Sequence, residues 1–165
     1  MYCIYEFFSG WRHPFLGKYK VAFDRNGKIQ AADIKLYNNA GWTMDLSAAV
    51  MEKAMTHSDN CYKIPNIRVK GHVCKTNLPS NTAFRAFGGP QGMIIAEEWI
   101  EKVAAKLKLP AEHVRKINFY QENMLTHYNQ TLKDCTIEKC WVECEKMSMF
   151  SELKKEVEEF NKNNR

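Results

Sequence analysis

Residues 74–93 read CKTNLPSNTAFRAFGGPQGM, and the rest of the chain is organised around this stretch. The stretch opens like the end of a strand and closes like the start of a helix, with Pro90 in the first helical turn. Asn, Ser, Thr, Pro and Gly dominate between these ends and favour irregular backbone. Phe84, Arg85 and Phe87 lie in this loop, where core packing does not require them. Because binding groups concentrate on loops held by a rigid frame, this loop is the candidate binding site.

The glycines that follow the loop have two interpretations. Gly88 and Gly89 permit close approach of the backbone to another group. The helix N-terminus after them offers free N–H groups and a partial positive charge, which suit an oxyanion. A well-ordered turn without a ligand explains the same residues equally well, because glycine-rich turns are common. The residues alone leave both interpretations open.

Hydrophobic periodicity predicts one α+β unit, with an early β-hairpin and a further strand followed by several helices. Alternation predicts a hairpin from Tyr19 to Gly41 around a turn at 24–27, with a bulge where the alternation changes phase between Ala31 and Ala32. A half-buried strand over 67–74 leads into the loop. Helices are predicted from Thr43 as cap to about 57, from 90 to about 107, from a start within 109–112 to near 118, and from the cap Thr136 onward, and 119–133 is predicted to be loop.

The predicted helix over 43–57 has an unusual lysine. At 100° steps, Leu46, Ala49, Val50 and Ala54 form one apolar stripe, and Lys53 falls within it. A buried ammonium needs a partner, so either the lysine stem crosses apolar surface and the head reaches water, or the cation points into a polar cavity. The sequence does not decide between these two placements.

The composition indicates a folded protein of one domain. Its 165 residues are 45% hydrophobic and 26% charged, with a net charge of +5 and lysines spread along the chain. These values exclude a disordered chain and argue against a nucleic-acid partner, because there is no dense basic block. No apolar run approaches the ~20 residues that span a bilayer, so no membrane partner is expected. Met1–Phe8 is short, lacks a basic leading region and includes Glu6, so a signal peptide is not expected.

The chain has six cysteines, at positions 3, 61, 74, 135, 140 and 144. Because no signal peptide is expected, reduced thiols and a cytoplasmic location are expected for them. None of them has the C-x2-C spacing of zinc ribbons or common iron–sulfur sites. Cys140 and Cys144 lie one helical turn apart and could share a ligand, but buried thiols are the expected state. His72 falls on the polar side of its strand and is expected in solvent rather than on a metal.

Four runs together resemble a known family. The run Cys74–Met93 is similar to the molybdopterin-binding domain of the xanthine dehydrogenase/aldehyde oxidase family of molybdenum hydroxylases, and so are Met51–Ala54, Asp59–Asn66 and Arg12–Phe15. The resemblance extends in unbroken order from about residue 10 to residue 164, and it is closer to xanthine dehydrogenase than to aldehyde oxidase. It implies an unmatched segment over 1–10 and part of a larger molybdopterin-binding domain over 11–165.

The resemblance also implies roles for particular residues. Enzymes of this family oxidise purines or aldehydes at a molybdenum atom held by a pterin. Arg85 matches the arginine whose backbone lies against the molybdenum centre, which places it in the shell of the metal and not as a side-chain ligand. Phe87 matches the aromatic residue that stacks on the substrate, and Lys53 stands where xanthine dehydrogenases have an arginine that contacts the purine. The implied cofactor-binding residues are Phe84, Arg85, Gly88, Gly89 and Gln91.

One residue departs from the family pattern. Ala86 stands where the family has glycine, and a positive φ there would cost alanine on the order of 1–2 kcal/mol and shift its neighbours.

The resemblance leaves catalysis outside this chain. The family's catalytic glutamate follows the matched segment, and its 2Fe-2S clusters and FAD are bound by other modules. No catalytic residue is therefore assigned here, and the chain alone is not expected to turn over xanthine. The expected partners are the remainder of a molybdenum-hydroxylase chain, a purine or aldehyde substrate, and a second copy. A catalytically silent domain that binds a purine or a protein through Phe84–Phe87 is the alternative, and a small basic nucleic-acid binder is a weaker one.

Overall fold

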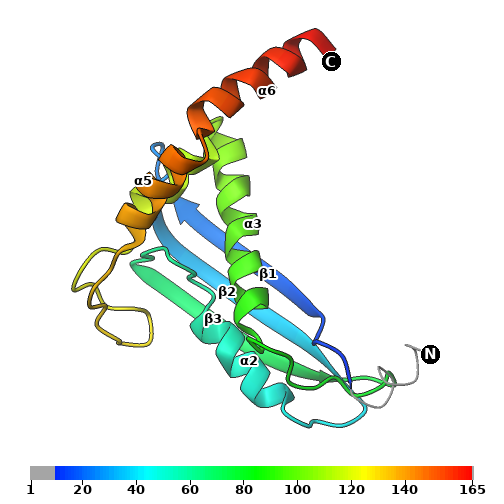
Figure 1. Cartoon of the computed structure of the whole chain (residues 1–165). Coiled ribbons are helices and arrows are strands. Elements are labelled where there is room, and N and C mark those ends of the chain that lie inside the picture. Colours follow the sequence, from blue (N-terminus) through cyan, green and yellow to red (C-terminus); the bar gives the residue numbers. More distant parts are fainter. Residues whose placement is uncertain (1–9, 165) are drawn as a thin grey trace.

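A three-stranded sheet with the strand order β1-β2-β3 underlies the fold, and α2 and α3 cross one of its faces (Figure 1). The computed structural model describes residues 10–164, so residues 1–9 of the segment that was expected to be unmatched, and the expectation about a signal peptide, lie outside the described residues. The elements are β1 (Phe15–Phe23), β2 (Ile29–Gly41), α2 (Ser47–Thr56), β3 (Asn66–Lys75), α3 (Gly89–Leu107), α4 (Ala111–Asn118), α5 (Ile137–Met147) and α6 (Phe150–Asn164). The predicted α+β class is confirmed.

β1 and β2 form the predicted antiparallel hairpin. The bulge lies one residue before its predicted place: Ala22 pairs with Ala31 and Phe23 pairs with Ile29, so Gln30 is the extra residue. The extra residue changes the phase of the strand, which returns Ala32 to the buried face after Ile29.

β3 pairs in parallel with β2, an arrangement that the sequence analysis did not predict. Parallel neighbours need a crossover connection, and α2 supplies it between the two strands. The register pairs Ile34 with Val69 and Asn39 with Cys74, at the end of β3 that leads into the loop. The candidate loop is therefore anchored at the edge of the sheet beside the crossover helix.

The buried faces of the two central helices differ from the predicted stripes. In α2 the buried residues are Ser47, Val50, Met51 and Ala54. α2 begins at Ser47 because Thr43 does not cap it: Thr43 instead hydrogen-bonds to Ser80, with 2.5 Å between the two hydroxyl oxygens. The buried stripe therefore lies on a different side of the helix from the predicted one, and Lys53 is exposed rather than within it.

In α3, Trp99 and Ala104 join the predicted Ala96, Ile100 and Val103 in the core, whereas Met93 is 37% exposed. The first turn of α3 packs on α2 through Gly92, and the side of the helix that carries Met93 faces solvent.

The last third of the chain packs more loosely. Residues 119–133 form the predicted irregular segment, although Phe119, Tyr120 and Thr126 are buried. α5 and α6 have no buried residue, and α6 projects from the body (Figure 1). The expectation of buried thiols at Cys140 and Cys144 is wrong, because both side chains are exposed on α5. None of the described helices is long and apolar enough to cross a membrane.

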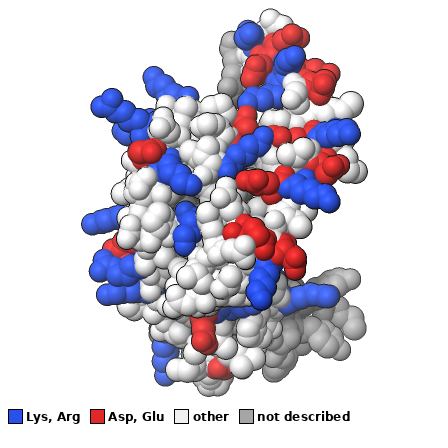
Figure 2. Space-filling view, turned by 90° about the vertical axis from the view of Figure 1, so that its left-hand side faces the viewer, with Lys and Arg blue, Asp and Glu red and all other residues white. Residues whose placement is uncertain are grey.

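The face of the sheet opposite α2 and α3 is strongly basic. Cross-strand pairing places Lys18 beside Lys35 and Lys35 beside Lys70, and Arg68 forms an ion pair with Asp33 on the same face. Figure 2 shows Lys and Arg side chains projecting at its left-hand side, where this face lies. His72 is exposed on this face, as predicted, and stacks on Tyr37 with 4.8 Å between the ring centroids.

Candidate functional site

The loop between β3 and α3 presents its side chains outward from a strained backbone. Phe84 is 54% exposed and Arg85 is exposed, while Phe87 is half-buried. Three consecutive residues have positive φ: Ala86 at 69°, Phe87 at 23° and Gly88 at 101°. Only glycine adopts such values without cost, so the loop holds strain at Ala86 and Phe87.

Strain of this kind persists only where the surrounding structure fixes it, and α2 provides part of that support. A Cβ on Gly88 would lie 2.0 Å from Val50 O, and a Cβ on Gly92 would lie 2.4 Å from Ala54 O. Both positions therefore require glycine, because the start of α3 touches the α2 backbone directly. This contact fixes where the loop enters the helix.

Some backbone N–H groups of the loop are engaged in hydrogen bonds within it, and others have no acceptor among the described residues. The Phe87 N–H donates to Phe84 O at 2.7 Å, and the Gly89 N–H donates to Ala86 O at 2.9 Å. Those of Arg85, Ala86 and Gly88 donate to no acceptor within residues 10–164. The helix start itself has fewer free donors than predicted, since Gly89 is engaged and Pro90 has no N–H. The available donors lie in the loop just before the helix.

A short segment before β1 lies against the loop. The Thr82 N–H donates to Trp11 O at 3.1 Å, and Arg12 Nη2 donates to Arg85 O at 2.9 Å. The Arg12 guanidinium also lies over the Phe84 ring, 4.9 Å from its centroid. In the sequence, Arg12 stands out only as part of a run that resembles the family, and no role is predicted for it.

Lys53 and the loop meet at the same corner of the molecule. Lys53 lies on the exposed side of the α2 turn whose Val50 and Ala54 contact Gly88 and Gly92. Its ammonium forms no ion pair or hydrogen bond in the described part of the chain. The structure thus supports the placement in which the Lys53 head reaches water.

The other predicted residues lie beneath this surface. Gly88 and Gly89 are buried, and the Gly89 Cα faces the ring of His57. Gln91 Nε2 donates to His13 O at 3.2 Å, while Gln91 Oε1 is buried without a partner between residues 10 and 164. Predicted binding residues therefore divide into a surface group (Lys53, Phe84, Arg85 and Phe87) and a supporting group (Gly88, Gly89 and Gln91).

A buried polar cluster supports the corner from below. His13 Nε2 lies 2.6 Å from the Ser47 hydroxyl, and Asn38 Nδ2 donates to Ser47 O at 2.9 Å. Burial lowers the pKa of His13, although the charge of Asp45 opposes this effect. The cluster joins the start of β1, β2 and the first residue of α2, so it fixes the N-terminal end of the helix that carries Lys53.

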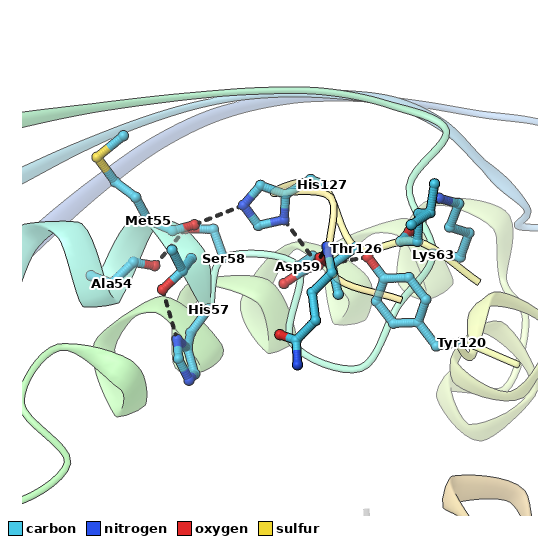
Figure 3. A network of polar contacts seen from close by, with 12 residues as sticks. Ala54, Met55, His57, Ser58, Asp59, Lys63, Tyr120, Thr126 and His127 are labelled. Atoms are coloured by element: carbon cyan, nitrogen blue, oxygen red, sulfur yellow. Dashed lines mark hydrogen bonds and ion pairs between the residues drawn. The ribbon is translucent and has the colours of Figure 1, made fainter. Parts of the chain in front are cut away.

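A second network, which the sequence analysis did not predict, fixes the other end of α2 (Figure 3). Buried Asp59 accepts a hydrogen bond from the Tyr120 hydroxyl at 2.6 Å, and His127 Nδ1 lies 3.0 Å from the same carboxylate. His127 Nε2 lies 3.1 Å from Met55 O, at the end of the helix. Burial and the bond to Asp59 raise the pKa of Tyr120 well above its usual range. The network ties the irregular segment over 119–133 to α2.

A groove of about 380 Å³ lies away from this corner, between α4 and the α5–α6 junction. Ala111, Trp141, Cys144 and Phe150 line it, with charged side chains at its rim. Its carboxylates are paired, because Glu112 binds Lys154 and Glu145 binds Lys116. No cluster of three metal-ligating side chains occurs among residues 10–164.

Comparison with known proteins gives matches along most of the chain. Residues 7–119 match the family model described as "Molybdopterin cofactor-binding domain". The chain is 54% identical over 156 residues to xanthine dehydrogenase/oxidase of Felis catus and 56% identical over 157 residues to that of Gallus gallus. These matches cover 94% and 95% of this chain but only 12% of each relative.

A solved structure has the same fold as this chain. Aldehyde oxidoreductase from Desulfovibrio desulfuricans superposes with a TM-score of 0.82 at 26% identity, over 91% of this chain and 16% of that protein. The chain therefore spans about an eighth to a sixth of the length of these proteins, which agrees with its expected place in a larger domain.

Proposed function

This chain belongs to the molybdopterin cofactor-binding domain family, and on that premise we propose that it forms part of the pocket for the molybdenum cofactor and a purine in a xanthine dehydrogenase-like oxidoreductase. The observation that carries the proposal is the corner at which the loop over 84–88, with its unused N–H groups, meets the α2 turn bearing Lys53. The activity is that of a larger polypeptide, and this chain supplies one wall of its pocket.

The residues present fit the cofactor. Molybdopterin is rich in oxygen and nitrogen acceptors, and the N–H groups of Arg85, Ala86 and Gly88 have no acceptor among the described residues. Successive N–H groups in a left-handed turn form a concavity that suits anions and oxo groups. The cofactor, when bound, supplies the redox chemistry. The chain's part is to hold it through these donors, over the support of Gly89 and Gln91.

Phe87 and Lys53 are the proposed substrate residues. An aromatic face suits a flat heterocycle, and Phe87 is half-buried, so its ring is held while part of it stays accessible. Lys53 offers one positive charge to purine oxygens but lacks the planar fork of arginine. We therefore include oxidative hydroxylation of hypoxanthine or xanthine in the proposal, with Lys53 making a single contact where a guanidinium would make two.

The described cysteines and the surface of α6 bear on the location and the partners of the chain. Its five described cysteines are free thiols, in keeping with a cytoplasmic location. The apolar side chains of α6, with Leu153, Val157 and Phe160 between 48% and 64% exposed, suit a contact with the remainder of the polypeptide or a second copy. A catalytically silent domain is not favoured, because more than half of the residues are identical to those of xanthine dehydrogenase/oxidase relatives along 94–95% of the chain.

A chimera tests the proposal. Residues 10–164 would replace the matching segment of the Gallus gallus relative, which is 56% identical, and the product would be purified from cells that make the cofactor. Mass spectrometry should find near-equimolar molybdenum and pterin, and urate should form from xanthine. A folded chimera without cofactor would refute the cofactor assignment. A loaded chimera that forms no urate would refute the purine assignment.

A further inference from the structure

We propose that Arg12 is a positioning residue that holds the loop over 84–88 in its ligand-facing conformation. Its guanidinium contacts two adjacent loop residues in different ways: Nη2 donates to Arg85 O at 2.9 Å, and Cζ lies 4.9 Å from the centroid of the Phe84 ring. The identity of the ligand at this loop rests on the proposed function, whereas the positioning by Arg12 is a property of the chain alone.

The contacts are ones that arginine alone can make together. A planar guanidinium donates in its plane and stacks with its face, so one group fixes a carbonyl and a ring at the same time. A lysine ammonium at this position keeps the charge but has no flat face and no fork. Arg12 therefore restrains both the backbone and the side-chain side of the loop.

The position of Arg12 is fixed independently of the loop residues it contacts. On one side, Trp11 O accepts from the Thr82 N–H at 3.1 Å. On the other side, His13 O accepts from Gln91 Nε2 at 3.2 Å, and His13 itself is buried against Ser47. The segment over 11–13 is thus joined to both ends of the loop, and Arg12 reaches its middle.

Burial of one guanidinium nitrogen supports a defined role. Arg12 Nη1 is buried and has no acceptor among residues 10–164. A buried N–H without a partner is unfavourable, and a long side chain that was free to turn would place it in water. Arg12 remains in this position because its other contacts hold it there.

The loop needs such a restraint. Ala86 and Phe87 have positive φ, which for these residues persists only when neighbouring structure enforces it. Gly88 fixes the loop at its α3 end, whereas Phe84 and Arg85 are exposed. Without Arg12, the first half of the loop is free to relax, and the N–H groups of Arg85 and Ala86 are no longer held in place.

Limited proteolysis of the chain tests this inference. Trypsin cleaves after Arg85 when the loop opens, and cleavage after Arg25, in the exposed turn of the hairpin, serves as the internal reference. Arg12→Met should raise the ratio of cleavage after Arg85 to cleavage after Arg25 by about tenfold or more, the change expected from losing a charged hydrogen bond. Arg12→Lys should raise it less.

Two further variants keep the test decisive. Arg68→Lys removes a guanidinium fork from Asp33 on the remote sheet face, so it should leave the ratio unchanged. Phe84→Leu removes the ring under Arg12 from an exposed position, so it should raise the ratio a few-fold without unfolding the chain, even if Arg12→Met does not fold. The urea midpoint of each variant separates local opening from global unfolding. Ratios for Arg12→Lys and Phe84→Leu within about twofold of wild type would overturn the inference.

The chimera distinguishes failure of this inference from failure of the proposed function. Proteolysis is measured without cofactor, whereas pterin content is measured in the chimera. If Arg12→Met opens the loop and the unmodified chimera binds no pterin, the positioning role stands and the proposed function fails. If the chimera binds pterin and the proteolysis ratio does not change, only the positioning role fails.

Discussion

Replacing Ala86 by glycine should stabilise the chain, although it removes a methyl group. Ala86 has a φ of 69° and is exposed, so its Cβ contributes strain and little packing. A left-handed conformation costs a residue with a Cβ about 1–2 kcal/mol, and glycine loses about 0.4–1 kcal/mol through the greater entropy of the unfolded chain. The difference predicts a net gain of about 0.5–1 kcal/mol, which corresponds to a rise in Tm of roughly 1–4 °C for a chain of this size.

Urea unfolding followed by circular dichroism measures the gain, with Ala83→Gly as the matched control. Ala83 lies in the same loop, and it is not among the residues with positive φ. Glycine there relieves no strain, so Ala83→Gly should lower the free energy of unfolding by about 0.4–1 kcal/mol. The two substitutions are thus expected to act in opposite directions. If Ala86→Gly lowers the free energy of unfolding as much as Ala83→Gly does, the strain assigned to this turn does not exist.

Three further predictions concern the support beneath the corner. Gly92→Ala should destabilise the fold by about 1–3 kcal/mol in urea unfolding, because its Cβ would lie 2.4 Å from Ala54 O and the helices would have to separate. Stability should fall as the pH drops below about 6.5, because the lowered pKa of buried His13 means that the unfolded chain binds the proton more readily. His13→Gln should flatten this pH profile. Tyr120→Phe should cost about 1–3 kcal/mol, because it leaves buried Asp59 without a hydroxyl donor at 2.6 Å.

The first and the last of these predictions have a control of the same chemical kind. For the first, the control is Gly89→Ala, because a Cβ there would meet only the His57 ring at an ordinary 3.5 Å. For the last, it is Tyr128→Phe at a side chain that is 44% exposed. Equal losses within either pair would contradict the reasoning. A pH profile that is the same in wild type and His13→Gln would contradict the role of His13.

Local pattern was enough to predict most of the elements. A hairpin with a bulge was predicted from the alternation from Tyr19 onward, the turn at 24–27 and the phase change near Ala31. This was possible because the period of a strand depends only on neighbouring residues. The short helix expected to start within 109–112 and to end near 118 was predicted for the same reason, and it is observed over Ala111–Asn118. Glycine at the position of Ala86 in the resembling family raised the possibility of a positive φ there, and the structure has one.

Pattern was less reliable where a neighbour decides which face is buried. The stripe expected through Leu46 is rotated in the structure, because α2 begins at Ser47, which His13 and Asn38 hold in the interior. Met93 fits an apolar stripe but is exposed, since the first turn of α3 packs on α2 through Gly92 instead. Periodicity alone does not show where a helix begins or which of its turns meets another backbone.

The sequence by itself therefore determined the α+β class, the hairpin, the family and the loop that carries the candidate site. Only the tertiary structure decided the parallel pairing of β3 with β2, the exposure of Cys140 and Cys144, and the contacts of Arg12 and His127. The physical reason is separation along the chain. Strand and helix periods depend on residues a few positions apart, whereas Arg12 and Arg85 lie 73 positions apart and meet only after the sheet and the crossover helix have brought them together.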